Sequence, residues 1–414
     1  MRQELFDKIL AFFIIFLLVE TTVVPIVLGF NNINPTLLDN KKAISDNDLL
    51  FDLKIKLLMK IGHIPSISVC IIKNNTIVWD KGYGFYDRLL RKKPDVNTVY
   101  MAGSISKTIT TAALMQLYEK GYFNLDDNVS KFLPFDLKNP RYPNINITFR
   151  MLLAHQSSLH DHNELSSYKY EFSNNYNYSY FKELLTPNGK DYHPEYWAAY
   201  PPGKEANYSN LGLILLGYIV ERMTNQSLEQ YCQKNIFNPL NMKNSSFQID
   251  NLNRGNLAVP YFQIAGIYLR IPHTDFSFVD PAGGLYTTAE DLSHFLIAHM
   301  NGGVYNGIRI LNESTINLMH TVQYPNSSIY IIYRFGLGWL IIPNENGEAY
   351  QGHDGDTICF HAKMRICDSN GNGVIFFYNV GSGPWKALRK IDFRIENECL
   401  YLIKNLLFEK ARNI

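Results

Sequence analysis

Ser104 and Lys107 stand three residues apart in the segment SISK. On a helix, positions three apart share a face, so this spacing presents a hydroxyl and an amine together. A serine hydroxyl is a weak nucleophile that needs a base within hydrogen-bond reach. A lysine serves as that base only when burial or a neighbouring cation lowers its pKa from about 10.4. The pair therefore predicts acyl transfer to Ser104, although Ser166 and Lys169 repeat the spacing in a loop-like region.

Two further polar segments follow in the order Tyr208-Ser209-Asn210 and His353-Asp354-Gly355. A phenol and an amide beside the serine and lysine would complete a proton-transfer site, and the last segment would add a wall carried by a strand. Taken singly, the first segment also fits a helix cap, and the second fits the end of a strand. The ordered set is what predicts a serine acyl-transfer site.

Hydrophobic periodicity predicts the helices that would hold these residues. Apolar residues at helical spacing favour a helix from Ser104 to Gly121, where a glycine ends it. A second helix opens at Thr288, with Asp291 three residues later as a variant of the capping box. Similar patterns predict further helices at 49–61, 148–154, 210–223, 288–300 and 385–409.

β-Branched and aromatic residues predict the strands. These strands lie at 66–73, 76–85, 335–342, 357–367 and 373–379. Both chain ends thus supply strands plus a helix, and the middle supplies helices. We expect an α/β (α+β) fold in which one antiparallel sheet is built from both ends and flanked by helices. Its sheet domain would comprise residues 48–86 plus 330–414, with a large, mainly helical domain inserted at 87–329.

Further segments accompany the three motifs in a fixed order. They are MAGSISKTIT at 101–110, TFRMLLAHQSSL at 148–159, Pro202-Gly203 and PAGGLYTTAEDL at 281–292. With them the chain resembles class C-type members of the serine β-lactamase and penicillin-binding-protein superfamily over residues 49–403. This group includes D-alanyl-D-alanine carboxypeptidases, aminopeptidases and esterases. The resemblance implies a β-lactamase/transpeptidase-like fold and a serine hydrolase, and it leaves the substrate open.

The resemblance also implies a role for each matching residue. Ser104 would be the acylated nucleophile, and Lys107 would assist its deprotonation. Tyr208 would carry the proton, as base in acylation and as acid toward the leaving group. Asn210 would hydrogen-bond Lys107 or the substrate amide.

The third motif stands where many β-lactamases carry Lys-Thr-Gly, and His353 there is common among esterase and peptidase relatives. Gly355 would let the substrate approach the strand. The backbone N–H groups of Ser104 and Asp356 would form the oxyanion hole. Asp354 and Asp356 add carboxylates where relatives often carry small or hydroxyl side chains. We expect Asp354 to face the substrate and this charge to disfavour free carboxylates, which favours esters, amides or cationic substrates over penicillins.

A second departure from the family pattern lies in the segment His155-Gln156-Ser157-Ser158-Leu159, where Ser158 replaces the usual glycine. The cost of this replacement depends on whether the backbone there needs a positive φ.

Composition limits the partners. The 414 residues include 39 basic and 38 acidic residues, without a long run of like charge, so nucleic acid is not expected. With 46% hydrophobic residues, a sizeable core can be buried. The resemblance implies no metal and no organic cofactor, and the expected partner is a small-molecule or peptide substrate. The oligomeric state stays open.

The N-terminus predicts export. Arg2 and Lys8 flank an apolar run of about 11 residues, which suits a signal peptide. We expect residues 1–29 to be that signal, followed by a polar linker at 30–47 and a secreted or lumenal protein. The alternative is an uncleaved anchor from Ile9 to Gly29 that tolerates Glu20, which would place the domain on the lumenal or extracellular side of a membrane.

Glycosylation sequons support export, although an Asn-rich chain also makes them by chance. They occur at Asn74, Asn128, Asn146, Asn177, Asn207, Asn225, Asn244, Asn312 and Asn326. Asn207 adjoins Tyr208, so we expect that sequon to be unused. The five cysteines form no CxxC pair. One disulfide through Cys70 or Cys399 is open, and we expect Cys359 and Cys367 to lie far apart on one strand.

Two rival functions remain open. His160-Asp161-His162 with Glu164 faintly resembles a metallo-hydrolase cluster, but the closing histidine is absent. Sensitivity to chelators would distinguish that reading. The other rival is a secreted glycoprotein that keeps the fold as a catalytically weak or inactive binding module. Failure of Ser104 to react with any acylating probe would favour it.

Overall fold

The structure of this chain is a computed structural model. It describes residues 46–161, 178–264, 266–273, 280–326, 333–345, 348–367, 371–381 and 390–414. Residues 1–52 and 53–414 form separate units, and 46–52 of the first unit begin helix α3 (Asp46–Ile61). The expected signal or anchor, most of the linker, the Asn177 sequon, His162 and Glu164 lie outside the described residues. Among the described residues, no helix is both long and apolar enough to cross a membrane.

One sheet draws its strands from both chain ends, as expected. Its seven strands run in the order β2-β1-β13-β12-β11-β10-β9, and every neighbouring pair is antiparallel. Their bounds are β1 Ser66–Lys73, β2 Thr76–Gly84, β9 Arg334–Phe335, β10 Leu340–Glu345, β11 Glu348–Asp356, β12 His361–Cys367 and β13 Asn372–Tyr378. The predicted α/β fold with an antiparallel sheet is confirmed.

The hairpin of β1 and β2 follows directly from its sequence. β1 reads SISVCIIK, and all but the last of its eight residues are buried, as in a strand covered on both faces. The connecting residues Asn74 and Asn75 both adopt positive φ, 51° and 57°, which suits a tight two-residue turn.

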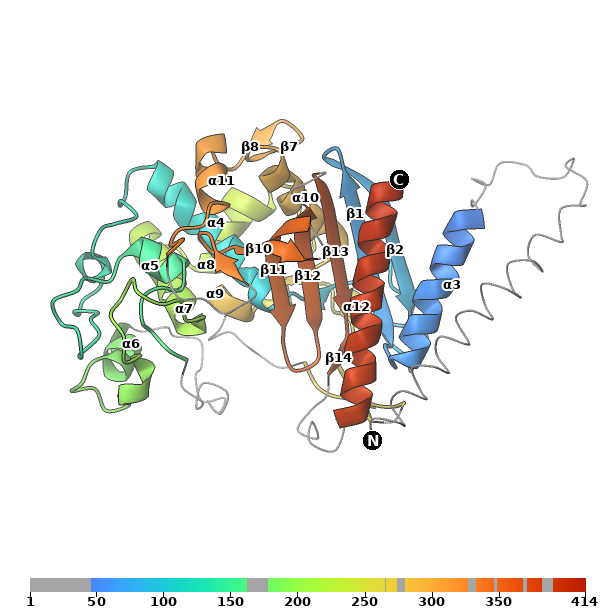
Figure 1. Ribbon diagram of the computed structural model, residues 1–414, viewed down its shortest axis with the longest axis horizontal. Helices are drawn as coiled ribbons and strands as arrows, with labels where there is room; N and C mark the ends of the chain where they lie inside the picture. Colours follow the sequence, from blue (N-terminus) through green and yellow to red (C-terminus); the bar gives the residue numbers. More distant parts are fainter. Residues whose placement is uncertain are drawn as a thin grey trace, which may run out of the picture. The chain divides into compact units, whose positions relative to one another are not determined.

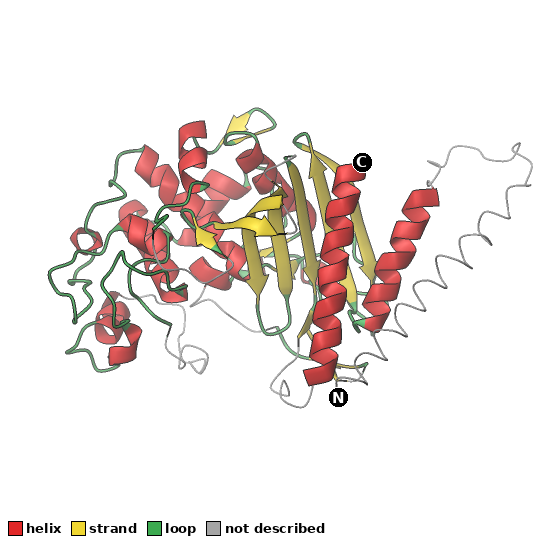
Figure 2. Cartoon of the chain, in the orientation of Figure 1, coloured by secondary structure: helices red, strands yellow, loops and turns green. Residues whose placement is uncertain are grey.

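Helices cover both faces of the sheet (Figures 1 and 2). Two adjacent residues of β13 point to opposite sides. Gly373 lies against Met300 of α10 (Ala289–Met300), whereas Asn372 donates its side-chain N–H to Ala411 of α12 (Lys390–Asn413) at 3.0 Å. α10 opens as predicted, because the Thr288 hydroxyl accepts the Asp291 N–H at 3.0 Å.

The helices between the two groups of strands pack around α4 (Ser106–Glu119), whose residues 106–117 are all buried. α7 and the one-turn α9 pack against it and against each other. The remaining helices are α5 Phe149–Leu153, α6 Tyr178–Leu185, α7 Asn210–Thr224, α8 Leu228–Cys232, α9 Asp280–Gly283 and α11 Glu313–Met319. Short strands join this region, namely β3 Tyr100–Met101, β4 Tyr261–Ile264, β5 Ile267–Arg270, β6 Tyr286–Thr287, β7 Val304–Tyr305, β8 Ile308–Arg309 and β14 Val380–Gly381. The proposed boundaries of an inserted domain stay a prediction.

Several expected strands differ in detail. The strand expected at 335–342 is two, β9 and β10, separated by a turn. No strand range was predicted for β11, although the third motif was expected to be carried by a strand. The strand expected from Thr357 begins at His361, because the Thr357 hydroxyl accepts the Phe360 N–H at 2.9 Å and closes a turn. Cys359 therefore lies in this turn and not on a strand. The Cys70 thiol is buried and free, so it forms no disulfide.

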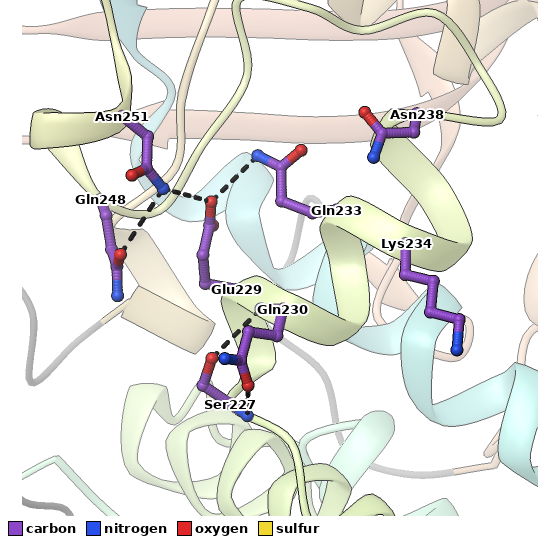
Figure 3. Close-up of a pocket in the computed structure, with 8 residues that line it drawn as sticks. All are labelled: Ser227, Glu229, Gln230, Gln233, Lys234, Asn238, Gln248 and Asn251. Carbon is purple, nitrogen blue, oxygen red and sulfur yellow. Dashed lines mark hydrogen bonds between the residues drawn. The ribbon is translucent and has the colours of Figure 1, made fainter.

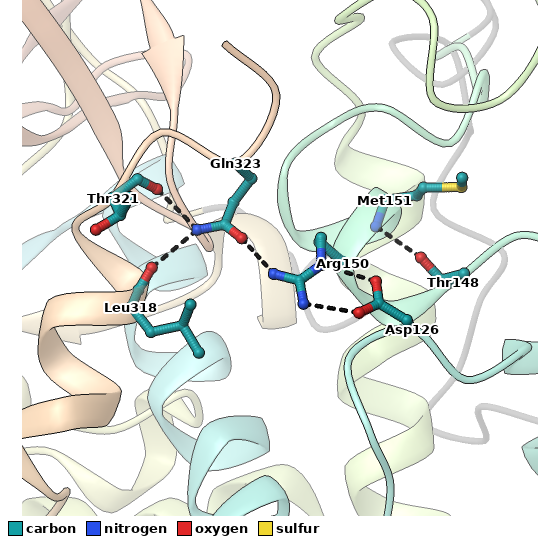
Figure 4. Close-up of polar contacts among 7 residues, drawn as sticks. All are labelled: Asp126, Thr148, Arg150, Met151, Leu318, Thr321 and Gln323. Atoms are coloured by element: carbon teal, nitrogen blue, oxygen red, sulfur yellow. Dashed lines mark hydrogen bonds and ion pairs between the residues drawn. The ribbon is translucent and has the colours of Figure 1, made fainter.

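A polar cluster joins α5 to the segment before β9 (Figure 4). The Arg150 guanidinium donates two hydrogen bonds of 2.8 Å to the Asp126 carboxylate and one of 2.6 Å to the Gln323 side-chain oxygen. The Gln323 amide donates in turn to the carbonyls of Leu318 and Thr321. Three chain segments are thereby held together on the side of the molecule where β9 starts.

We expect Arg150→Met to lower the free energy of unfolding by about 1 kcal/mol, since the Asp126 carboxylate is 70% exposed and its pairing is screened by water. Hydrogen bonding to Arg150 lowers the pKa of Asp126, so this stabilisation is present above the usual carboxyl pKa and is lost as the pH falls through the lowered value. Urea unfolding at two pH values measures both effects. Lys131→Met at the looser 3.9 Å pair with Asp127 is the control, and an equal loss in both variants would contradict the assignment.

Candidate active site

Ser104 lies in a 3₁₀ turn, Gly103–Ile105, that leads directly into α4. The turn is held by Ser106, whose hydroxyl donates to the Gly103 carbonyl at 2.6 Å and accepts the Leu285 N–H at 2.9 Å. Gly103 has φ +54°, and a Cβ there would lie 2.8 Å from the Asp356 nitrogen. A glycine is therefore required where the serine turn presses against β11.

Lys107 is fully buried beneath Ser104. Its Nζ atom lies 2.9 Å from the Ser104 hydroxyl, 2.6 Å from the Asn210 side-chain oxygen and 2.6 Å from the Ala282 carbonyl. These partners come from the serine turn, α7 and α9, and Lys107 itself lies on α4, so the packing of these elements in the core fixes the amine. Ala282 belongs to the PAGG segment, and the sequence pattern did not reveal its role.

Burial lowers the pKa of Lys107 from 10.5 to about 7, against the opposing charge of Asp161. A neutral amine has two N–H groups and one lone pair. The Asn210 side-chain oxygen and the Ala282 carbonyl can only accept hydrogen bonds, so they take the two N–H groups. The lone pair then faces the Ser104 hydroxyl, which is the geometry that a general base requires.

Tyr208 immediately precedes Ser209, the cap of α7, and its phenol hydrogen-bonds Ser104. Burial raises its pKa, so the phenol stays protonated. The ring is wedged between Lys107, whose Nζ lies 4.9 Å from the ring centroid, and His155, whose ring lies 4.5 Å away. The His155 Nδ1 atom accepts the Ser209 N–H at 3.1 Å, and burial lowers its pKa well below 6.5, which keeps the imidazole neutral.

The third motif lies on β11 beside this group. Gly355 approaches so closely that a Cβ would lie 1.8 Å from the Ala102 carbonyl oxygen. His353 is buried, its ring lies 6.1 Å from that of Tyr208, and its Nδ1 atom donates to the Asp354 carbonyl at 2.6 Å. Burial lowers the pKa of His353 to about 3, so the ring is neutral. The structure thus brings the three motifs together around one hydroxyl.

Asp354 does not face Ser104, which corrects the expectation of a substrate-facing carboxylate. Alternate residues of a strand point to opposite sides, and Gly355 points toward the serine turn. The Asp354 carboxylate forms ion pairs with two residues of the neighbouring strand β12, Arg365 at 2.6 Å and Lys363 at 3.0 Å. Two cations compensate its charge, so the argument against substrates with a free carboxylate no longer holds.

Asp356 contributes its backbone to the site and turns its side chain away. Its backbone nitrogen lies beside Gly103. Its carboxylate is hydrogen-bonded to the His361 Nδ1 atom at 2.5 Å. β11 pairs with β10 as far as Gly352 and with β12 as far as Asp356. The strand edge from residue 353 onward therefore borders the serine turn. An oxyanion hole formed by the Ser104 and Asp356 N–H groups stays a prediction.

Ser158 adopts φ +60°, a left-handed conformation that favours the glycine of the family pattern. Its hydroxyl accepts the Asn139 side-chain N–H at 2.9 Å in a buried position. The serine is thus accommodated with a hydrogen bond that glycine could not make.

The weak metal-cluster reading gains no support from the described residues, among which no group of three or more His, Cys, Asp or Glu could hold a metal ion. Asp161 instead accepts hydrogen bonds at the start of α7. The sequence analysis named Asp161 only as part of a rival metal cluster and did not predict its hydrogen bonds to α7.

None of the predicted site residues lines the cavity in Figure 3. Its volume is about 460 Å³, and each residue that lines it has a polar or charged side chain. The buried carboxylate of Glu229 accepts hydrogen bonds from Gln233, Ser246, Asn251 and the Phe247 N–H. These bonds give Glu229 a structural role in joining α8 to the loop that follows it.

A protein-family model described as Beta-lactamase matches residues 51–396 of this chain. Among curated proteins, the chain is similar to Protein flp of Staphylococcus aureus (strain NCTC 8325 / PS 47), with 28% identity over 340 residues. The match covers 82% of this chain and 64% of that protein, so the chain spans less than two thirds of its relative's length.

Two solved structures share the fold. The octameric penicillin-binding protein homologue from Pyrococcus abyssi superposes with a TM-score of 0.66 and 26% identity, over 84% of this chain and 77% of that one. The D-amino acid amidase from Ochrobactrum anthropi SV3, complexed with L-phenylalanine amide, has a TM-score of 0.68 and 20% identity. That match covers 87% of this chain and 99% of the amidase.

Proposed function

Because this chain belongs to the beta-lactamase family, whose members are serine hydrolases, we propose that it hydrolyses an ester or amide through an acyl intermediate on Ser104. The observation that carries the proposal is the buried amine of Lys107, 2.9 Å from the Ser104 hydroxyl and held by two acceptors on its other side. A lone pair aimed at a hydroxyl is what activates a serine for attack.

In acylation, neutral Lys107 takes the Ser104 proton as the oxygen attacks the substrate carbonyl. The backbone N–H groups of Ser104 and Asp356 would bind the oxyanion of the tetrahedral intermediate. Collapse of this intermediate breaks the bond to the leaving group, which receives a proton from Tyr208. The raised pKa of Tyr208 suits this role as an acid, and leaves the first deprotonation to Lys107. Tyr208 regains its proton from the Lys107 ammonium.

Deacylation repeats these steps with water as the nucleophile. Lys107 removes a proton from the water, and the hydroxide attacks the acyl carbonyl. Collapse breaks the bond to the Ser104 oxygen and releases the carboxylic acid product. The Ser104 oxygen receives a proton from Tyr208, which regains one from the Lys107 ammonium. No cofactor takes part in any of these steps.

The substrate class is proposed as a small ester, amide or peptide. The compensated charge of Asp354 removes the earlier ground for excluding substrates with a free carboxylate. β-Lactams and D-Ala-D-Ala peptides therefore belong in the same screen as activated esters and amino-acid amides. The amidase relative, whose structure was determined with L-phenylalanine amide, supports including the amides.

Intact-mass spectrometry with a fluorophosphonate probe tests the proposal. A single adduct on the wild-type protein, mapped to the peptide that contains Ser104, would support a live nucleophile. Complete absence of an adduct on folded protein would refute it and favour the binding-module rival. The same mass reports whether residues 1–29 have been removed, which tests the proposed export of the protein.

The rate of labelling should rise with pH and reach half of its plateau near pH 7. The pKa of Lys107 lies near 7, so below that pH the amine is protonated and cannot accept the serine proton. Each further unit of acidity should slow labelling by up to about tenfold. Labelling reactions quenched at a series of times, at pH 5 to 9, measure how the labelling rate depends on pH. A midpoint close to the ordinary lysine value would show that burial does not tune Lys107.

A further inference from the structure

Asp161 binds the start of α7 through both of its carboxylate oxygens. Oδ1 accepts from the Ser209 hydroxyl and the Leu211 N–H, each at 3.1 Å. Oδ2 accepts from the Asn210 backbone N–H and from its side-chain Nδ2, each at 2.8 Å. The carboxylate also lies at the N-terminus of α7, where the helix dipole attracts negative charge.

The bond to Asn210 Nδ2 decides which way the Asn210 amide faces. An ionised carboxylate can only accept hydrogen bonds, so the amide must turn its NH₂ group toward Asp161. Its oxygen then faces Lys107, at 2.6 Å from Nζ. A flipped amide would set its oxygen against the carboxylate and its NH₂ against the Lys107 N–H groups, which is unfavourable on both sides.

We infer that Asp161 is a positioning residue, which fixes the Asn210 amide and thereby directs the Lys107 lone pair at Ser104. This inference rests on the proposed function for its effect on acylation, and on the hydrogen bonds of Asn210 to Asp161 and Lys107 for the orientation of the amine. Asp161 acts through Asn210, and the described structure shows no hydrogen bond from it to Ser104 or Lys107. It lies in the loop after α5, a segment distinct from all three motifs.

The Asp161 charge has a second effect on the same amine. It raises the pKa of Lys107, against the lowering caused by burial. Replacing the carboxylate with a neutral side chain therefore has two separable consequences, a slower acylation and a Lys107 pKa that moves further down. Loss of a purely structural hydrogen bond would produce the first without the second.

The test compares Asp161→Asn with Ser209→Ala. Asp161→Asn removes the charge, and its own NH₂ group opposes the donors of α7. Ser209→Ala is the structural control, because it removes another hydrogen bond to Asp161 and the 3.2 Å cap bond to the Gly212 N–H, but leaves the carboxylate facing Asn210. Thermal unfolding of both variants checks that they are folded. Asp161→Ser, which keeps a small acceptor, replaces Asp161→Asn if that variant does not fold.

We expect Asp161→Asn to slow plateau fluorophosphonate labelling by about 10- to 100-fold and to move the pH midpoint below that of the wild type. Ser209→Ala should slow labelling by less than about threefold, with the midpoint unmoved. The positioning role would be overturned if Asp161→Asn were labelled at the wild-type rate, or if its labelling were slower but its pH midpoint unchanged.

A measurement without turnover separates this inference from the proposed function. The ¹³Cε signal of Lys107, assigned by its loss in Lys107→Arg, reports the titration of the amine directly. A lower midpoint in Asp161→Asn than in the wild type supports the inference even on protein that no probe labels. Equal midpoints would refute it, whereas absence of labelling in the wild type refutes only the proposed function.

Discussion

Ser104→Ala should abolish covalent labelling completely while leaving the protein folded. The substitution removes the only oxygen that we propose as the attacking nucleophile. Ser104 is half-buried and the Lys107 amine keeps its bonds to Asn210 and Ala282, so we expect the free energy of unfolding to change by less than about 1 kcal/mol. Intact-mass spectrometry and urea unfolding measure the two quantities on the same samples.

Ser106→Ala is the matched control for this result. Ser106 lies two residues away, but its hydroxyl is committed to Gly103 and Leu285 within the turn. Its loss should lower the free energy of unfolding by about 1–3 kcal/mol, because buried polar groups lose their partner, and should keep the adduct on Ser104. An adduct that persists in Ser104→Ala would show that the probe reacts elsewhere and would remove the basis of the proposed mechanism.

Lys107→Met should slow labelling of Ser104 by about 10²- to 10⁴-fold, the usual range for loss of a general base. Methionine is close to lysine in length and suits a buried position. The labelling that remains should no longer show a midpoint near pH 7, because the group that titrates there has been removed. Rate constants measured across pH distinguish loss of the base from general damage to the site.

Lys120→Met provides a comparison from the end of the same helix. Lys120 is exposed at the C-terminal cap of α4, where its amine lies 5.7 Å from the Tyr231 ring centroid. Labelling rate and pH midpoint should both match the wild type. If Lys107→Met keeps the wild-type rate and midpoint, another group must deprotonate Ser104, and Tyr208 becomes the candidate.

The helices and the chemistry of α4 could be predicted because their signals are local. Periodic apolar residues mark α4 and α7, and Thr288 marks the start of α10. β11 was missed because its sequence, EAYQGHDGD, contains no β-branched residue and has two glycines. Pairing with β10 on one side and β12 on the other makes it a strand, and such tertiary pairing is invisible in a window of sequence.

The role of Asp161 and the orientation of Asp354 were hidden for related reasons. Asp161 hydrogen-bonds to Ser209, Asn210 and Leu211, which lie 48 to 50 residues further along the chain, so no short motif predicts these contacts. The side that Asp354 faces depends on the register of β11 against β12, in which it pairs with Lys363. A register shift of one residue would have turned the Asp354 side chain to the opposite face of the sheet.

The internal place of β1, between β2 and β13, has a consequence for biosynthesis. A chain leaves the ribosome N-terminus first, so the hairpin of β1 and β2 emerges early. The other edge of β1 stays unpaired until β13 has been synthesised, because Ile67 pairs with Tyr378. Until then the nascent chain carries a mainly apolar strand with one unpaired edge, the kind of surface that promotes aggregation and attracts chaperones. Premature termination between the serine turn and β13 would leave the serine turn present but the sheet open. Released fragments of that kind should be cleared as misfolded chains, and enzymatic activity should report full-length synthesis.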